Sequence, residues 1–391
     1  MSPPDDADGS TPESIESLVC PDCGATFLDR WRCSCGSPLE FDANPHPTSP
    51  SPPDPGGFDV RAGMWAFEEF LPIGGDPDDR VTFGAGPTPI VDADRAGDES
   101  EETEEADEPW NCRFKLEYVL PTGSFKDRGA TTILTRAREL GVERLCEDSS
   151  GNAGTAVATY AARAGIDAEI YLPASSAAST IRAIERVGAD AVPIEGKRRA
   201  ATDACLEAVE SGSAWYASHA WNPAFHAGTA SFAYEVALQS GWEVPDAVVV
   251  PAGHGTLLLG AHRGFDRLRE AGWIDRTPRL LAAQAAGNAP VVRELHDADA
   301  ANRGGDNDAA KGIRIENPPR IDGMIEAIRE TGGDAIAVTE SDTRAALGRL
   351  RREGFDVEAT SAVAPAALEA YRERGILDPD EDVVVPLTGR A

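Results

Sequence analysis

Beyond residue 113, short apolar runs alternate with longer stretches in which apolar side chains recur at helical spacing. The short runs are rich in Val, Ile and Ala, which is typical of strands that are buried on both faces. The predicted strands are 167–172, 190–194, 246–250 and 382–385. The predicted helices are 152–164, 179–187, 200–210, 255–269, 342–353 and 361–373. This repeated strand, helix, strand order predicts an α/β fold built on a buried parallel sheet.

The first 60 residues follow a different pattern. Residues 1–40 contain a cluster of cysteines and are interpreted as a small zinc-ribbon-like segment. Residues 41–60 are rich in proline and cannot pack a core, so we interpret them as a linker. Residues 61–391 have the composition of a globular domain.

The cysteine cluster reads CxxC, nine residues, then CxC, and consists of Cys20, Cys23, Cys33 and Cys35. In a reducing compartment such a cluster indicates a metal site, not disulfides. Four thiolates close a tetrahedral zinc site and leave no open coordination position, so any zinc here is expected to be structural. A degenerate site without metal is the alternative.

The net charge of the chain limits the kinds of partner that it is expected to bind. The 391 residues include 36 Lys plus Arg and 67 Asp plus Glu, for a net charge of −31. We therefore expect neither nucleic acid nor an anionic membrane surface as a partner, because the negative charge of the protein would repel both. The lysines are few: Lys115, Lys126, Lys197 and Lys311.

An acidic, lysine-poor chain indicates a halophilic protein in a saline cytoplasm, because carboxylates stay hydrated when salt has screened longer-range repulsion. No apolar run approaches the roughly 20 residues that span a bilayer. The first ten residues lack the basic start and apolar core of a secretion signal. We therefore expect a cytoplasmic location.

Two glycine-rich turns join predicted strands to predicted helices. They are residues 148–154 (DSSGNAG) and residues 251–256 (PAGHGT), and the second follows an apolar strand directly. In open α/β sheets, such turns hold anions at helix N-termini. The second turn can hold a phosphate, but it lacks the lysine of a P-loop and the acidic residue that reads a ribose, which disfavours ATP and NAD.

Lys126 lies within the sequence PTGSFKDRG, residues 121–129. Arginine cannot act as an amine nucleophile at neutral pH, so a lysine kept in an arginine-rich chain indicates a chemical role. A lysine beside a phosphate-binding turn is what a pyridoxal phosphate enzyme needs to form a Schiff base. A surface lysine is the alternative that spacing leaves open.

These motifs resemble those of the threonine synthases, which belong to the fold type II, tryptophan-synthase-β-like pyridoxal phosphate enzymes. The resemblance covers about residue 61 to the C-terminus. It is carried by Lys115-x-Glu117 followed by PTGSFKDRG, and by GAGPTP (84–89), SSGNAG (149–154), QAAGNAP (284–290), GIRI (312–315), EATSA (358–362) and LTG (387–389).

The resemblance implies two open α/β domains around a parallel sheet, with residues 111–222 as a smaller mobile subdomain. It leaves open a homodimer or a monomer. It implies pyridoxal 5′-phosphate as cofactor, with Lys126 as its covalent attachment and Asn152 at its 3′-oxygen. Thr388 would face the pyridine nitrogen, and the residues implied to bind the cofactor phosphate are Gly253, His254, Gly255 and Thr256.

The implied reaction converts O-phospho-L-homoserine and water to L-threonine and phosphate. Ser149 and Ser150 are candidates for binding the substrate carboxylate, and N-capping is their equal alternative. Ser124 is a further substrate candidate from the lysine motif. Lys115 and Arg128 are the candidate cations for the substrate phosphate, unless they pair with Glu117 or Asp127.

Two positions depart from the threonine synthase pattern. Leu120 stands where Asn usually precedes PTGSFKDR, and Ala85 stands where Glu is common. Serine/threonine ammonia-lyases and β-replacement enzymes share the fold and the lysine without needing a site for a second phosphate. They therefore remain the alternative function.

Overall fold

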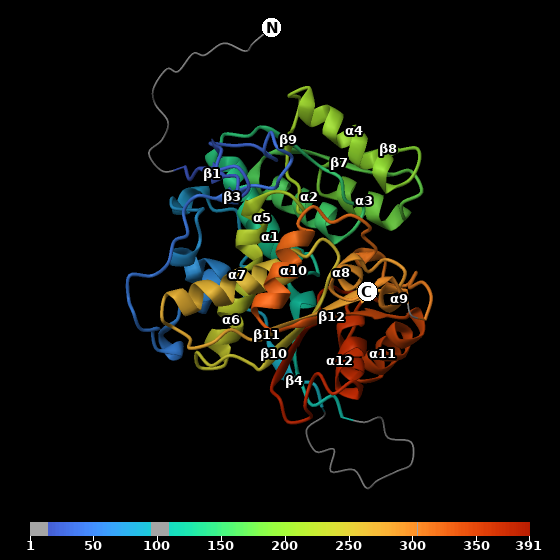
Figure 1. Cartoon of the computed structure of the whole chain (residues 1–391). Helices are drawn as coiled ribbons and strands as arrows, with labels where there is room; N and C mark the ends of the chain where they lie inside the picture. The colour runs from blue at the N-terminus through green and yellow to red at the C-terminus, as the bar shows by residue number, and fades with distance from the viewer. Residues whose placement is uncertain (1–14, 95–108, 303) are drawn as a thin grey trace.

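The computed structural model describes residues 15–94, 109–302 and 304–391. Three sheets organise the chain, and helices cover both faces of the two larger ones (Figure 1). The strands are β1 (Leu18–Val19), β2 (Thr26–Phe27), β3 (Glu40–Phe41), β4 (Ile90–Asp92), β5 (Arg113–Lys115), β6 (Arg144–Glu147), β7 (Asp167–Pro173), β8 (Asp190–Ile194), β9 (Trp215–Tyr216), β10 (Ala247–Pro251), β11 (Arg279–Ala285), β12 (Asp334–Val338) and β13 (Val383–Pro386).

The α-helices are α1 (Lys126–Glu139), α2 (Asn152–Ala164), α3 (Ala178–Arg186), α4 (Arg198–Glu210), α5 (Pro223–Thr229), α6 (Ser231–Gln239), α7 (Thr256–Glu270), α8 (Pro290–Leu295), α9 (Ala298–Ala301), α10 (Ile321–Glu330), α11 (Glu340–Arg352) and α12 (Val363–Glu373). The 3-10 helices are η1 (Pro55–Gly57), η2 (Val60–Phe70), η3 (Pro77–Asp79), η4 (Glu117–Val119) and η5 (Lys311–Ile313). Among the described residues, none of these helices combines the length and apolarity needed to cross a membrane.

The larger sheet has six strands in the order β12-β11-β10-β13-β5-β4, parallel except for β4. Its strands β10, β11 and β13 are buried on both faces, which explains their nearly continuous apolar sequence. Val248 and Val250 of β10 pack on one side with α6, α7 and α10, whereas Ala247 and Val249 pack on the other with α11 and α12.

The smaller sheet has four parallel strands in the order β8-β7-β6-β9. It forms its own core with α1, α2 and α5. All four strands lie within residues 111–222, the range expected for the smaller subdomain, but β5 at the start of that range belongs to the larger sheet.

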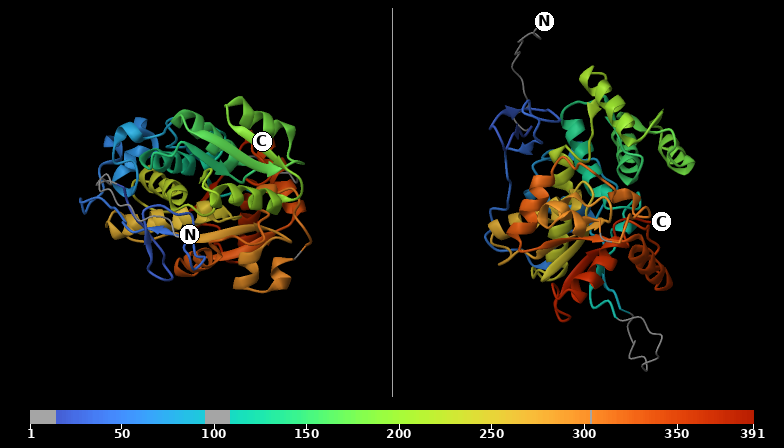
Figure 2. Two further views of the ribbon diagram at one scale, coloured as in Figure 1. Left: turned by 90° about the horizontal axis from the view of Figure 1, so that it is seen from above. Right: turned by 45° about the vertical axis from the view of Figure 1, so that its right-hand side comes forward.

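The N-terminal segment folds as a three-stranded antiparallel sheet, β2-β1-β3, that lies against the rest of the molecule (Figure 2). Of the expected ribbon segment, residues 1–14 lie outside the described residues. The proline-rich stretch after it runs along the core and is held there by tryptophans. Trp273 Nε1 donates to Ser49 O at 3.0 Å, and Trp242 Nε1 donates to Pro53 O at 2.8 Å.

The elements that the periodicity predicted lie close to their predicted positions. Helix α2 and strand β8 have the predicted bounds, and the other predicted strands and helices are found with shifts of one or two residues at their ends. The pattern did not show that the strands divide between two sheets, because that division depends on contacts distant in sequence.

Candidate active site

A cavity of about 600 Å³ lies between the two parallel sheets, lined by residues from both. Helices α1, α2, α4 and α7 each begin at a residue that lines it, and none of the four has a side-chain cap. Uncapped helix N-termini present free N–H groups and the positive end of the helix dipole. The cavity is therefore built to hold anionic groups.

Lys126 is the first residue of α1, and its side chain enters the cavity. Nζ donates to Thr256 Oγ1 at 3.0 Å, at the start of α7. Burial lowers the pKa of Lys126 to about 7, with Glu147 opposing the shift and Arg198 adding to it. A neutral amine is therefore available near pH 7, as Schiff-base chemistry requires.

The turn between β10 and α7 packs too closely for side chains at its two glycines. A Cβ on Gly253 would lie 2.9 Å from Ile313 Cα. Gly255 has a φ of 78°, and a Cβ there would lie 2.2 Å from Met324 Sδ. Glycine is thus required at both positions for the turn to take this path, which places its other two predicted phosphate-binding residues, His254 and Thr256, at the cavity wall.

Asn152, Glu358 and Thr388 also line the cavity, and each has a polar partner. Asn152 Nδ2 donates to Glu358 Oε1 at 3.0 Å. Thr388 is buried, and its Oγ1 lies 3.1 Å from Ser361 Oγ. Burial raises the pKa of Glu358, while Asn152 and Lys126 oppose the shift. The residues expected to contact the cofactor ring, Asn152 and Thr388, therefore face the same space as Lys126.

Lys115 and Arg128 do not reach the cavity, so their expected role in binding the substrate phosphate is not supported. Both are fully buried in a network with Glu117 and Glu235. Lys115 Nζ lies 2.8 Å from Glu235 Oε2 and also donates to Thr88 O and Gln239 Oε1, which uses all three ammonium protons.

Arg128 is held as tightly as Lys115. It pairs with Glu117, which was one of the alternatives left open by the sequence. Its Nε donates to Glu117 Oε2 at 2.7 Å, and its Nη1 donates to Glu235 Oε1 at 2.6 Å. The two cations are balanced by two carboxylates inside the core. This network anchors the start of α1, and hence Lys126, to β5 and α6.

The three candidate serines differ in their position relative to the cavity. Ser149 and Ser150 line the cavity, and Ser149 Oγ accepts from Gly151 N at 3.3 Å. Ser124 does not line it; its hydroxyl is buried without a partner among the described residues. Ser124 instead bridges to Gly389 through the backbone.

The cavity also contains residues that the sequence did not single out as a group: Arg198, His219, Lys311 and Glu358. His219 Nδ1 lies 2.5 Å from Glu147 Oε1 in a buried pair. Lys311 was noted because the chain has few lysines, but neither a periodic pattern nor a motif indicated Arg198 or His219. Their proximity to Lys126 arises only when the two sheets come together.

The four cysteines of the N-terminal segment meet at one point. All four Sγ atoms lie within 4.8 Å of one another, with Cys20 and Cys35 at 3.5 Å and Cys23 and Cys33 at 3.4 Å. Zn–S bonds of about 2.3 Å in a tetrahedron separate the sulfurs by about 3.8 Å. The cluster therefore fits a four-thiolate zinc site.

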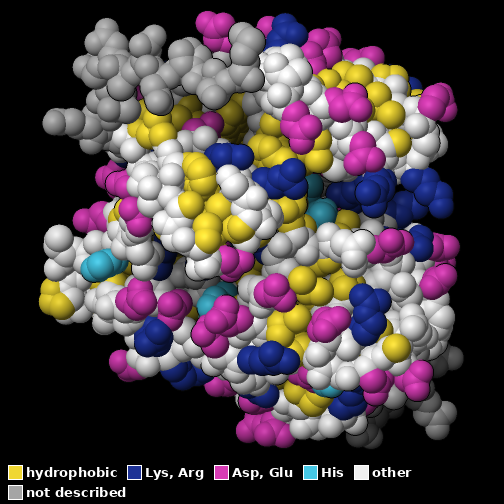
Figure 3. Space-filling model, turned by 45° about the horizontal axis from the view of Figure 1, so that its top comes forward, with side chains coloured by type: hydrophobic (Ala, Val, Ile, Leu, Met, Phe, Trp, Pro, Cys, Tyr) yellow, Lys and Arg dark blue, Asp and Glu magenta, His cyan; other side chains and the backbone are white. Residues whose placement is uncertain are grey.

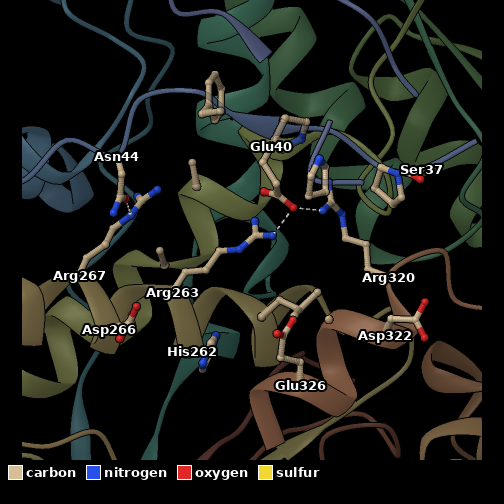
Figure 4. A pocket seen from close by; sticks show the side chains of 18 of the residues that line it. Ser37, Glu40, Asn44, His262, Arg263, Asp266, Arg267, Arg320, Asp322 and Glu326 are labelled. Atoms are coloured by element: carbon tan, nitrogen blue, oxygen red, sulfur yellow. Dashed lines mark hydrogen bonds and ion pairs between the residues drawn. The ribbon is translucent and has the colours of Figure 1, made fainter. Parts of the chain in front are cut away.

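A second cavity, of about 500 Å³, lies where this segment meets α7 and α10 (Figure 4). Arg263 and Arg320 both point to Glu40 and form ion pairs with it. Arg320 Nη2 also donates to Leu39 O and to Trp221 O. These contacts hold the cysteine segment against helices α7 and α10.

The model of the family "Pyridoxal-phosphate dependent enzyme" matches residues 81–389. A threonine synthase from Methanosarcina acetivorans is 33% identical over 330 residues, which is 83% of this chain and 79% of that protein. A threonine synthase from Methanocaldococcus jannaschii is 32% identical over 377 residues, or 95% of this chain and 91% of that protein.

Solved structures share the fold at lower identity. A fungal L-serine ammonia-lyase from Rhizomucor miehei superposes with a TM-score of 0.61 at 24% identity, covering 72% of this chain and 90% of that one. A cysteine synthase from Entamoeba histolytica gives 0.61 at 19% identity, covering 78% and 86%. With these matches and the lysine, turn and cavity described above, the chain belongs to the pyridoxal-phosphate dependent enzyme family and, within it, to the threonine synthases.

Proposed function

We propose that this protein converts O-phospho-L-homoserine and water to L-threonine and phosphate. The observation that carries the proposal is the position of Lys126. Its amine, with a pKa of about 7, lies at the phosphate-binding turn inside a cavity where uncapped helices begin. The similarity to threonine synthases along most of the chain supports this substrate.

The residues of the cavity suit pyridoxal phosphate. Lys126 would bind it covalently, the backbone of Gly253, His254, Gly255 and Thr256 would hold its phosphate, and Asn152 and Thr388 would contact its ring. When bound, the cofactor supplies an aldehyde that condenses with amines and a ring that accepts electrons from Cα. A Thr hydroxyl stabilises a ring cation less than a carboxylate would.

The chain's own groups then handle the protons. With cofactor and substrate bound, the freed amine of Lys126 would remove protons from Cα and Cβ of the substrate and deliver protons to Cγ and finally to Cα, because a pKa of about 7 suits both directions near neutral pH. Phosphate leaves from Cγ and water adds at Cβ. Thr256 Oγ1, 3.0 Å from Nζ, holds the amine in place.

Ser149, Ser150 and the N-terminus of α2 would bind the substrate carboxylate at the cavity wall. The smaller sheet carries this wall, whereas the phosphate turn and Thr388 belong to the larger sheet. Movement of the smaller subdomain toward the larger one would close the cavity over the substrate and control the access of water.

We also propose that Cys20, Cys23, Cys33 and Cys35 bind one structural zinc ion. The fit of the sulfur positions supports this site. Metal analysis of freshly purified protein is expected to give one equivalent of zinc, and protein without metal would refute it.

The decisive experiment measures phosphate release and threonine formation from O-phospho-L-homoserine, in molar potassium chloride with added pyridoxal phosphate. Wild type is expected to turn over, and Lys126→Ala to be inactive. Lys197→Ala, the same change at an exposed lysine, is the matched control. If folded, cofactor-loaded wild type is inactive, the proposed reaction is wrong, and serine, threonine and O-acyl or O-phosphoserine become the substrates to test.

A further inference from the structure

The burial of Lys115 and Arg128 leaves the substrate phosphate without its expected cations. Among the described residues that line the cavity, the Lys and Arg side chains are Lys126, Arg198 and Lys311. Lys126 serves the amine chemistry. In a chain of net charge −31, a dianionic group needs local positive charge, and Arg198 and Lys311 supply it.

We propose that Arg198, Lys311 and the His254 side chain form the subsite for the phosphate group of the substrate. This assignment rests on the proposed function and names the residues that select a phosphorylated substrate over serine or threonine.

Arg198 is placed to bind an anion. It is the first residue of α4, whose N-terminus has no side-chain cap. Nη2 lies 3.1 Å from His254 Nε2, and no carboxylate among the described residues forms an ion pair with this guanidinium. The positive charge of Arg198 acts inside the cavity, where it helps to lower the pKa of Lys126. A guanidinium and a helix N-terminus thus face the same space.

The contact with Arg198 determines the tautomer of His254. Burial, then Arg198 and Lys126, lowers the pKa of His254 well below its usual value, so the ring is neutral. A guanidinium only donates, so Nε2 accepts and the proton is on Nδ1. Nδ1 is buried and has no hydrogen-bond partner in the part of the chain that the structure describes. Binding of a phosphate oxygen by this group therefore requires the ring to turn Nδ1 toward the cavity.

Lys311 comes from the other domain. It begins η5, next to Gly312, whose N–H donates to Thr360 Oγ1 at 3.2 Å. The lysine is exposed at the cavity wall. Arg198 follows a strand of the smaller sheet, whereas Lys311 and His254 lie in segments that follow strands of the larger sheet. A phosphate held by all three would therefore draw the two domains together.

The surface around the cavity agrees with this role. On the face drawn in Figure 3, a run of Lys and Arg side chains lies beside a His side chain at a hollow between the upper and lower parts of the molecule. Asp and Glu side chains are spread over the rest of this face. Lys and Arg side chains also lie elsewhere on this face, but this run borders the hollow, where positive charge favours the entry of an anionic ligand.

The test compares Arg198→Gln and Lys311→Gln with Arg199→Gln in the pyridoxal phosphate holoenzyme at fixed potassium chloride. Arg199 is the matched control, since it neighbours Arg198 on α4 but its side chain is 91% exposed. Three quantities are measured: the KM for O-phospho-L-homoserine, the calorimetric Kd for inorganic phosphate, and the Kd for pyridoxal phosphate.

A hydrogen bond to a charged group contributes roughly 1.5–3 kcal/mol, so Arg198→Gln should raise both the KM and the phosphate Kd by about 10-fold to 100-fold. Lys311→Gln should raise both by a smaller factor, and Arg198→Lys should recover part of the loss. The Kd for pyridoxal phosphate should stay unchanged in each variant, and Arg199→Gln should match wild type.

Two outcomes would overturn the proposal. One is phosphate binding equal to wild type in Arg198→Gln and Lys311→Gln. The other is a loss of pyridoxal phosphate affinity in these variants with an unchanged KM, which would assign the residues to the cofactor phosphate. If wild type does not turn over O-phospho-L-homoserine but its phosphate binding still requires both residues, the subsite stands and the proposed function fails.

Discussion

The buried charge network beneath Lys126 gives a quantitative prediction for Glu235→Gln. Glu235 is fully buried and pairs with Lys115 at 2.8 Å and with Arg128 at 2.6 Å. Replacing it with the isosteric amide leaves two buried cations against one carboxylate, Glu117. Breaking a buried ion pair in this way costs about 3–5 kcal/mol of unfolding free energy.

The titration of Glu235 gives an independent magnitude. Burial would raise its pKa, but Arg128 and Lys115 outweigh burial and lower the pKa from 4.5 to about 2. This shift corresponds to about 3 kcal/mol at neutral pH. Because the folded pKa is depressed, the contribution is fully present above pH 4.5 and is lost as the pH falls through 2.

The assay is denaturant unfolding at pH 7 in constant high salt, followed by circular dichroism. Asp382→Asn is the control, since its pair with Arg113 at 2.6 Å is partly exposed and such surface pairs contribute about 0–1 kcal/mol. Glu235→Gln should lower the unfolding free energy by about 3 kcal/mol or more, and the difference from wild type should shrink toward pH 2. A loss no greater than that of Asp382→Asn would refute the reasoning.

Three further predictions follow from the same structure. The rate at which the apoprotein binds pyridoxal phosphate should rise with pH and level off above about pH 7, because the pKa of Lys126 is lowered to about 7; a rate that keeps rising to pH 10 would contradict this. Cys23→Ser should abolish zinc binding and lower the melting temperature, while Cys112→Ser, outside the cluster, keeps its zinc; equal metal content in both would contradict the site. Lowering the salt from molar to millimolar should lower the melting temperature, because a net charge of −31 repels itself without screening, and salt-independent melting would contradict this.

Much of this molecule was determined by local sequence. The sequence alone shows the apolar runs of the buried strands and the apolar side of each amphipathic helix. Helix α2 and strand β8 have the predicted bounds. The lysine motif, the glycine turn and the cysteine spacing are also local, because each chemistry needs particular residues a few positions apart. These signals were enough to indicate the family, and they singled out Lys126 and the cysteine cluster as the candidates for cofactor and metal binding.

The partners of individual charges were decided only by tertiary structure. Lys115 and Arg128 lie in a specific motif, but the spacing of that motif could not show whether they bind substrate or pair with Glu235. Glu235 lies more than a hundred residues from both in the sequence. Arg198 and Lys311 carry no motif and come to one cavity only because two sheets pack together. A hydrogen bond or an ion pair depends on distance in space, and for these residues distance in space is set by the whole fold.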